Sequence, residues 1–138
     1  MKPVFADTVY YLALTNPRDQ YAASATRFTV EFSGSFVTTA WVLTEVANSL
    51  ARGPNRALFY ELYRDLAGDH RITIVLPTED LFGQGIELYS QRPDKEWSLT
   101  DCISFIVMRQ YGLTDAVTAD HHFEQAGFTV LLRQEGIG

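Results

Sequence analysis

Short apolar runs alternate with longer segments of helical periodicity along the whole chain, and this order constrains the fold more than any other feature. The predicted strands are residues 3–7, 36–38, 72–76, 116–118 and 128–132. The predicted helices are residues 8–14, 17–32, 39–50, 55–67, 78–90, 98–111 and 120–125. Strands that alternate with helices, without hairpin turns, pair in parallel and carry helices on both faces. The sequence therefore predicts a three-layer α/β/α fold with a central parallel sheet of about five short strands.

Local residue choices support these boundaries. Pro17 suits the first turn of a helix, and Thr39 and Ser98 suit the position just before one. The β-branched run at 72–76 predicts a buried strand, and the nearly all-apolar helix at 98–111 also predicts burial.

Composition fits a single domain over residues 1–138, since 46% of the residues are hydrophobic and 20% are charged. No apolar run approaches the ~20 residues of a membrane-spanning helix. The first seven residues lack the pattern of a signal peptide, so we expect a cytoplasmic location and no membrane partner. Cys102 is the single cysteine of the sequence, which excludes an internal disulfide and a cysteine zinc cluster, and its apolar neighbours predict inert burial.

The net charge is −6, from 11 Lys and Arg against 17 Asp and Glu. This balance argues against a protein that coats nucleic acid electrostatically, because such domains are usually basic. It remains compatible with an enzyme whose acids hold metal ions, because divalent cations offset negative charge locally.

Four acids lie at positions where an α/β sheet forms its sites, beyond the carboxyl ends of the strands. Asp7 ends the first predicted strand and Asp120 follows the fourth. Asp101 lies in the first turn of the apolar helix, and Glu45 lies on the helix after the second strand.

Each acid also has a purely structural interpretation. Asp7 and Asp120 are favoured helix caps, and Asp101 is spaced from Ser98 as in a capping box. Glu45 could lie on a solvated helix face. The combination is more informative than any single acid, although spacing alone does not prove that the four side chains meet.

Carboxylates that meet in one pocket repel each other, and burial raises their pKa values, so such a pocket needs a cation. Oxygen ligands without a cysteine cluster or a paired histidine motif favour Mg²⁺ or Mn²⁺. Such an ion can activate water, neutralise phosphate charge and orient an in-line attack, which is what phosphodiester hydrolysis requires.

The order of these motifs resembles the PIN-domain ribonucleases, and most closely the VapC-type toxins of toxin–antitoxin pairs. The similarity spans residues 4–132, and its most specific parts are Ser-Leu-Thr-Asp-Cys at 98–102 and Asp-His-His-Phe at 120–123, followed by Ala-Gly-Phe at 126–128. It implies a PIN-like fold and a Mg²⁺- or Mn²⁺-dependent endoribonuclease that acts on structured RNA. It also implies a homodimer that a small antitoxin silences.

By position, the resemblance implies catalytic and metal-binding roles for Asp7, Glu45, Asp101 and Asp120. Thr8 and Thr118 would orient these acids or a water molecule, and Asp94 would be a further acid near the rim. His121 and His122 are adjacent and do not share a helix face, which favours a helix-start or surface role over joint metal binding.

Two alternatives belong to other classes. The first is a PIN-fold module that binds RNA or protein without cutting, against which the intact set of four acids argues. The second is another acid-based α/β protein. Val9 stands where a phosphatase of that kind needs a second Asp, and a receiver domain needs a lysine after a late strand, whereas the lysines are Lys2 and Lys95.

Overall fold

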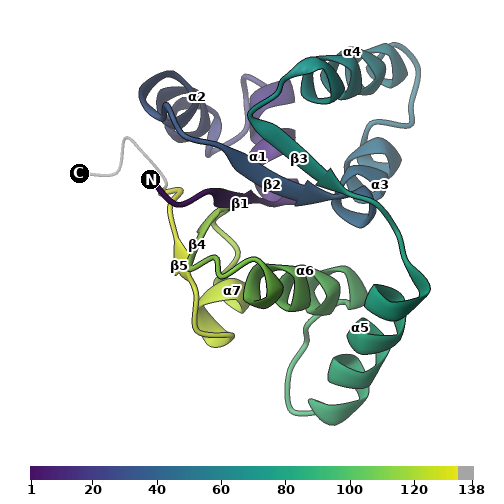
Figure 1. The fold of residues 1–138 in the computed structure, drawn as a ribbon. Helices are drawn as coiled ribbons and strands as arrows, with labels where there is room; N and C mark the ends of the chain where they lie inside the picture. Colours follow the sequence, from purple (N-terminus) through teal and green to yellow (C-terminus); the bar gives the residue numbers. More distant parts are fainter. Residues whose placement is uncertain (134–138) are drawn as a thin grey trace.

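A five-stranded parallel sheet runs through the centre of the protein in the computed structural model, which describes residues 1–133 (Figure 1). The strand order is β3-β2-β1-β4-β5, and each neighbouring pair is parallel. The strands are β1 (Val4–Ala6), β2 (Phe36–Thr39), β3 (Ile72–Val75), β4 (Asp115–Val117) and β5 (Thr129–Val130). Parallel pairing sends every strand toward the same edge, so all carboxyl ends lie together.

Helices cover both faces of the sheet, as the sequence predicts. They are α1 (Thr8–Thr15), α2 (Ala22–Glu31), α3 (Ala40–Ser49), α4 (Asn55–Gly68), α5 (Glu79–Gln91), α6 (Leu99–Gln110) and α7 (His121–Gln125). In Figure 1, α1, α2 and α4 lie on one side of the sheet, and α5, α6 and α7 lie on the other. The prediction of a three-layer α/β/α fold is therefore confirmed. Within the described residues, no helix is long and apolar enough to span a membrane.

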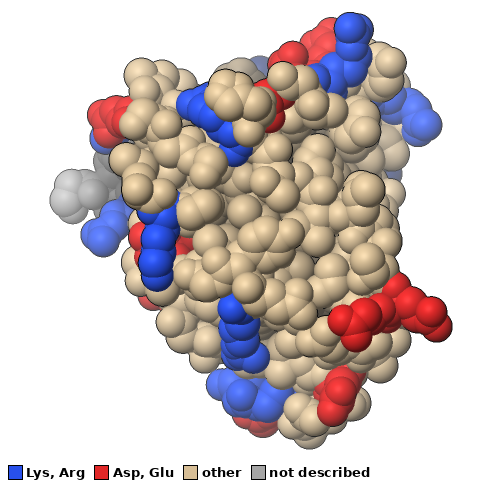
Figure 2. Space-filling view, viewed as in Figure 1, with Lys and Arg blue, Asp and Glu red and all other residues tan. Residues whose placement is uncertain are grey.

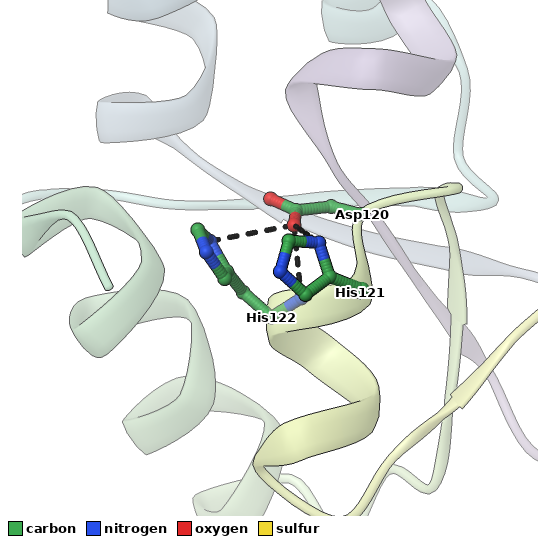
Figure 3. Close-up of side chains that lie close together, drawn as sticks. All are labelled: Asp120, His121 and His122. Atoms are coloured by element: carbon green, nitrogen blue, oxygen red, sulfur yellow. Dashed lines mark hydrogen bonds and ion pairs between the residues drawn. The ribbon is translucent and has the colours of Figure 1, made fainter. Parts of the chain in front are cut away.

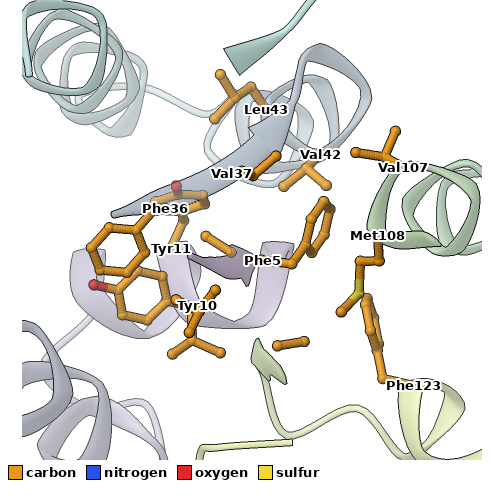
Figure 4. Close-up of a cluster of buried hydrophobic side chains, with 14 of the residues drawn as sticks. Phe5, Tyr10, Tyr11, Phe36, Val37, Val42, Leu43, Val107, Met108 and Phe123 are labelled. Carbon is orange, nitrogen blue, oxygen red and sulfur yellow. The ribbon is translucent and has the colours of Figure 1, made fainter. Parts of the chain in front are cut away.

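The core lies on both faces of the central strand β1, whose side chains are all buried. On the side of α6 and α7, Phe5 packs near Met108 and Phe123 (Figure 4). On the side of α1, Tyr10 stacks on Phe36 with ring centroids 5.9 Å apart. This two-sided burial anchors the end of β1, and it fixes the position of the residue that follows.

The helix predicted for residues 17–32 begins later than expected, at Ala22. The side chains of Asn16 and Asp19 accept hydrogen bonds from the backbone N–H groups of Arg18 and Tyr21, two residues further on. Short polar side chains that bond the backbone in this way stabilise turns, and here they override the helix signal of Pro17.

The β-branched strand β3 is only partly buried, which corrects the prediction of a buried strand. β3 pairs with β2 alone and forms one edge of the sheet, so the side chain of Thr73 is exposed. The prediction for the helix at 98–111 is confirmed, because seven residues of α6 are buried.

Candidate active site at the carboxyl ends of the strands

Asp7 and Asp120 lie at the same edge of the sheet because they follow the paired strands β1 and β4. Thr118 connects them. Its Oγ1 donates a hydrogen bond to Oδ2 of Asp7 at 2.8 Å, and the same oxygen accepts one from the backbone N–H of Asp120 at 3.1 Å. Thr118 is fully buried, so this connection is shielded from solvent. Thr118 therefore contacts both of the residues that follow β1 and β4.

Asp101 opens α6 and serves as half of a capping box. The Ser98 hydroxyl accepts a hydrogen bond from the Asp101 N–H at 3.0 Å, and Oδ2 of Asp101 accepts one from the Ser98 N–H at 3.2 Å. The predicted helix-capping role of Asp101 is therefore confirmed, but a capping residue can also belong to a functional site. Asp101 is only 8% exposed, and it faces the acids at the ends of the strands rather than open solvent.

Trp97 holds the start of α6 against α7. Its ring packs edge-on against Phe105 with centroids 5.0 Å apart, and its Nε1–H donates a hydrogen bond to Oε1 of Gln125 at 3.0 Å. Phe105 in turn packs on Phe123 of α7. These contacts join α6, whose first turn carries Asp101, to α7, which Asp120 caps.

His122 lies between those two acids, which sequence reasoning missed. Its Nδ1 is 3.1 Å from Oδ2 of Asp101. The same atom is 3.4 Å from Oδ1 of Asp120, and Figure 3 shows this second contact. The side chain of His121 is 71% exposed, whereas that of His122 is 19% exposed. The two adjacent side chains do differ in exposure, and both histidines lie at the start of α7, as the predicted helix-start or surface role allows, but His122 is not a surface residue. Its place beside the apolar Phe123, which is fully buried, was the available signal.

Glu45 reaches the site through Thr8. The Thr8 hydroxyl donates a hydrogen bond to Oε1 of Glu45 at 3.0 Å, and Thr8 directly follows Asp7. This contact joins α1 to α3 at the edge of the sheet where the other acids lie. Glu45 is half-buried, and Thr8 links it to the edge of the sheet where Asp7 lies.

Asp94 does not join the cluster. It is exposed on the loop between α5 and α6, where Arg92 donates two hydrogen bonds to its carboxylate at 2.9 and 3.0 Å. The guanidinium group of Arg92 lowers the pKa of Asp94 to about 2. The structure therefore pairs Asp94 with a surface cation instead of with the acids at the strand ends.

Burial disfavours the ionised form of the Asp7 carboxyl group. Loss of water, together with the charges of Asp101 and Asp120, raises its pKa from 3.8 to about 7, against the opposing effect of the hydrogen bond from Thr118. Burial and the charge of Asp120 also raise the pKa of Asp101. On the face shown in Figure 2, acidic side chains lie mainly toward the margins. The site is a partly desolvated acidic cluster.

This donor set fits a hard divalent cation. Three carboxylates from different elements act on one another, and each would gain from a positive charge placed among them. Among residues 1–133, the one group of three potential ligands whose donor atoms all lie within 4.8 Å is Asp120, His121 and His122. Cys102, next to Asp101, is buried as predicted and does not belong to that group.

Known proteins resemble this chain over almost its whole length. The family model for the PIN domain matches residues 4–129. The 23S rRNA-specific endonuclease VapC20 of Mycobacterium tuberculosis is 32% identical over 127 residues, which cover 91% of this chain and 95% of that protein.

Two solved structures share the fold. The crystal structure of M. tuberculosis VapC20, titled a sarcin–ricin loop cleaving toxin, matches with a TM-score of 0.85 and 26% identity, and covers 94% of this chain and 99% of its own. FitAcB from Neisseria gonorrhoeae matches with a TM-score of 0.60 at 18% identity, and covers 93% of this chain and 96% of its own. The second likeness shows the fold alone. Together with the family match, these similarities show that the chain belongs to the PIN-domain family and is a ribonuclease of the VapC type.

Proposed function

We propose that this protein uses Mg²⁺ or Mn²⁺, held by Asp7, Asp101 and Asp120 with Glu45 at the margin, to hydrolyse a phosphodiester bond of RNA. The observation that carries the proposal is the buried acidic cluster at the carboxyl ends of β1 and β4, where the pKa of Asp7 is raised to about 7. Such a cluster costs stability in a metal-free protein, and a cation that binds there offsets the cost. An arrangement with that cost is typical of a functional site.

The residues have separable roles. A divalent ion supplies water activation and neutralises charge on the scissile phosphate. Asp7 and Asp101 would bind the ion directly, and Thr118 would keep Asp7 turned toward it through the 2.8 Å hydrogen bond. Glu45, held by Thr8, would accept a proton from a water molecule at the edge of the cluster. Asp94 has no part in this scheme because its carboxylate is engaged by Arg92.

We further propose the sarcin–ricin loop of 23S rRNA as the substrate. The support is the 32% identity to a 23S rRNA-specific endonuclease and the structural match to a toxin that cleaves this loop. Cleavage of ribosomal RNA would stop translation, which fits the toxin of a toxin–antitoxin pair, active in the cytoplasm. A homodimer and a small cognate antitoxin are the partners that this assignment implies.

The test is a cleavage assay with purified protein on whole ribosomes, isolated 23S rRNA and an unrelated structured RNA of equal length. We expect a single cut in 23S rRNA with Mn²⁺ or Mg²⁺, no cut with chelator, and loss of the cut in Asp7→Asn. Asp80→Asn is the matched control, because Asp80 is an exposed acid of α5 whose carboxylate accepts a hydrogen bond from Gln84 of the same helix. Cleavage that persists in chelator contradicts the mechanism. Metal binding without cleavage of any RNA would favour a binding module instead.

A further inference from the structure

We propose that His122 is a positioning residue of the metal centre, whose Nδ1–H donates a hydrogen bond to Asp101 and thereby holds the carboxylates of α6 and α7 at a fixed separation. The inference rests on the proposed function and adds to it a residue outside the four acids. Asp101 and Asp120 belong to different elements, and each is held to its own backbone by capping bonds. The His122 side chain contacts both of them.

The distances favour a hydrogen bond to Asp101 over direct metal binding through the same atom. Nδ1 is 3.1 Å from Oδ2 of Asp101, within the usual range for a hydrogen bond, and 3.4 Å from Oδ1 of Asp120. A nitrogen that donates a proton has no lone pair for a cation. An ionised Asp101 carboxylate only accepts hydrogen bonds, so the contact assigns the proton to Nδ1 and leaves the lone pair on Nε2. Nδ1 therefore supports Asp101, and the substitutions below test whether Nε2 takes part in metal binding.

The Asp101 carboxylate shows what this support achieves. Its Oδ2 accepts hydrogen bonds from the Ser98 N–H and from His122, at 3.2 and 3.1 Å. Both bonds go to the same oxygen, so Oδ1 can serve a cation without breaking either of them. A ligating carboxylate that is oriented in this way binds metal more tightly, because its rotamer entropy is already lost.

The imidazole is itself held in place by α7. The backbone N–H of His122 donates a hydrogen bond to Oδ1 of Asp120 at 2.9 Å. The next residue, Phe123, is fully buried between Phe5 and Phe105. Phe123 therefore anchors this turn of α7, and the His122 side chain extends from the turn toward Asp101. The side chain of the neighbouring His121 is exposed to solvent instead.

The test uses two amides that imitate different nitrogens of histidine. The amide nitrogen of Asn lies near the position of Nδ1, and that of Gln lies near Nε2. In isothermal titration of Mn²⁺, we expect His122→Leu to bind 10–100-fold more weakly than wild type. His122→Asn should recover affinity to within about threefold of wild type, whereas His122→Gln should bind as weakly as the Leu variant. His70→Leu, at an exposed histidine just before β3, is the matched control and should bind Mn²⁺ like wild type, and thermal unfolding in chelator checks that each variant is folded.

Three results would overturn the proposal: unchanged affinity in His122→Leu, better rescue by Gln than by Asn, or nitrogen coupling from imidazole in the electron spin echo spectrum of bound Mn²⁺. The last two would make His122 a direct ligand. These outcomes differ from failure of the proposed function, in which wild-type protein itself would bind no Mn²⁺ and cut no RNA. That result would remove both proposals together.

Discussion

Replacement of Asp7 by Asn should make the metal-free protein more stable at high pH while it removes activity. Each tenfold change in an equilibrium constant corresponds to about 1.4 kcal/mol. A pKa raised from 3.8 to about 7 therefore means that ionised Asp7 costs the folded state about 4 kcal/mol. Asn has almost the same shape, carries no charge, and can still accept the hydrogen bond from Thr118. The folded state of the variant should therefore lack most of this destabilisation.

The sign of the pH dependence follows from the direction of the change. Because the pKa of Asp7 is higher in the folded state, the folded protein binds the proton more tightly than the unfolded chain does. The stability that comes from the protonated carboxyl is complete below pH about 4, and it is lost as the pH rises through about 7. Between pH 5 and pH 8 this linkage amounts to roughly 2.5 kcal/mol.

The assay is urea unfolding in chelator at several pH values from 5 to 8, for wild type and Asp7→Asn. Across this range the free energy of unfolding of wild type should fall by roughly 2.5 kcal/mol more than that of the variant. Addition of Mg²⁺ at pH 8 should raise the free energy of unfolding of wild type alone. Parallel pH dependence of the two proteins would refute the reasoning, because it would show that Asp7 titrates in the folded protein as it does in water.

Three further outcomes are expected. Thr118→Val should raise the pKa of Asp7 further and move the acidic limb of the pH–activity profile upward, whereas Thr118→Ser should keep the wild-type profile, as measured by initial cleavage rates. Gly85→Ala should destabilise the protein by about 1–3 kcal/mol in urea unfolding, since an added Cβ would lie 2.3 Å from the side chain of Ile103. Gly83→Ala on the same helix is the control, because an added Cβ meets nothing within 4 Å, and it should be neutral or slightly stabilising. Removal of divalent ions with chelator at pH 8 should lower the melting temperature of wild type and leave that of Asp7→Asn unchanged, as measured by scanning calorimetry.

The positions of Asp7 and Asp120 could be predicted from the sequence because they depend on topology. Both acids follow strands, and parallel strands end at one edge whatever their side chains are. The same rule explains why the three-layer fold was predictable from the alternation of elements. The start of α2 was not, because the turn at Asn16 and Asp19 depends on local hydrogen bonds that compete with a helix signal.

Residues whose role depends on packing were harder to predict. The spacing of Ser98 and Asp101 predicts a capping box, and the structure contains one, yet the same acid also faces the cluster. Only the contacts of Trp97 with Phe105 and Gln125 show why α6 and α7 lie close enough for His122 to reach Asp101. Such long-range contacts leave no periodic signal in a single sequence.

The most direct test of the central claim is a crystal structure of the protein soaked with Mn²⁺, with anomalous differences recorded near the manganese absorption edge. We predict a peak among the carboxylates of Asp7, Asp101 and Asp120, at about 2.1–2.2 Å from oxygen ligands, with His122 still bonded to Asp101. A peak elsewhere on the protein, or none at saturating Mn²⁺, would contradict the claim that these acids form one metal centre.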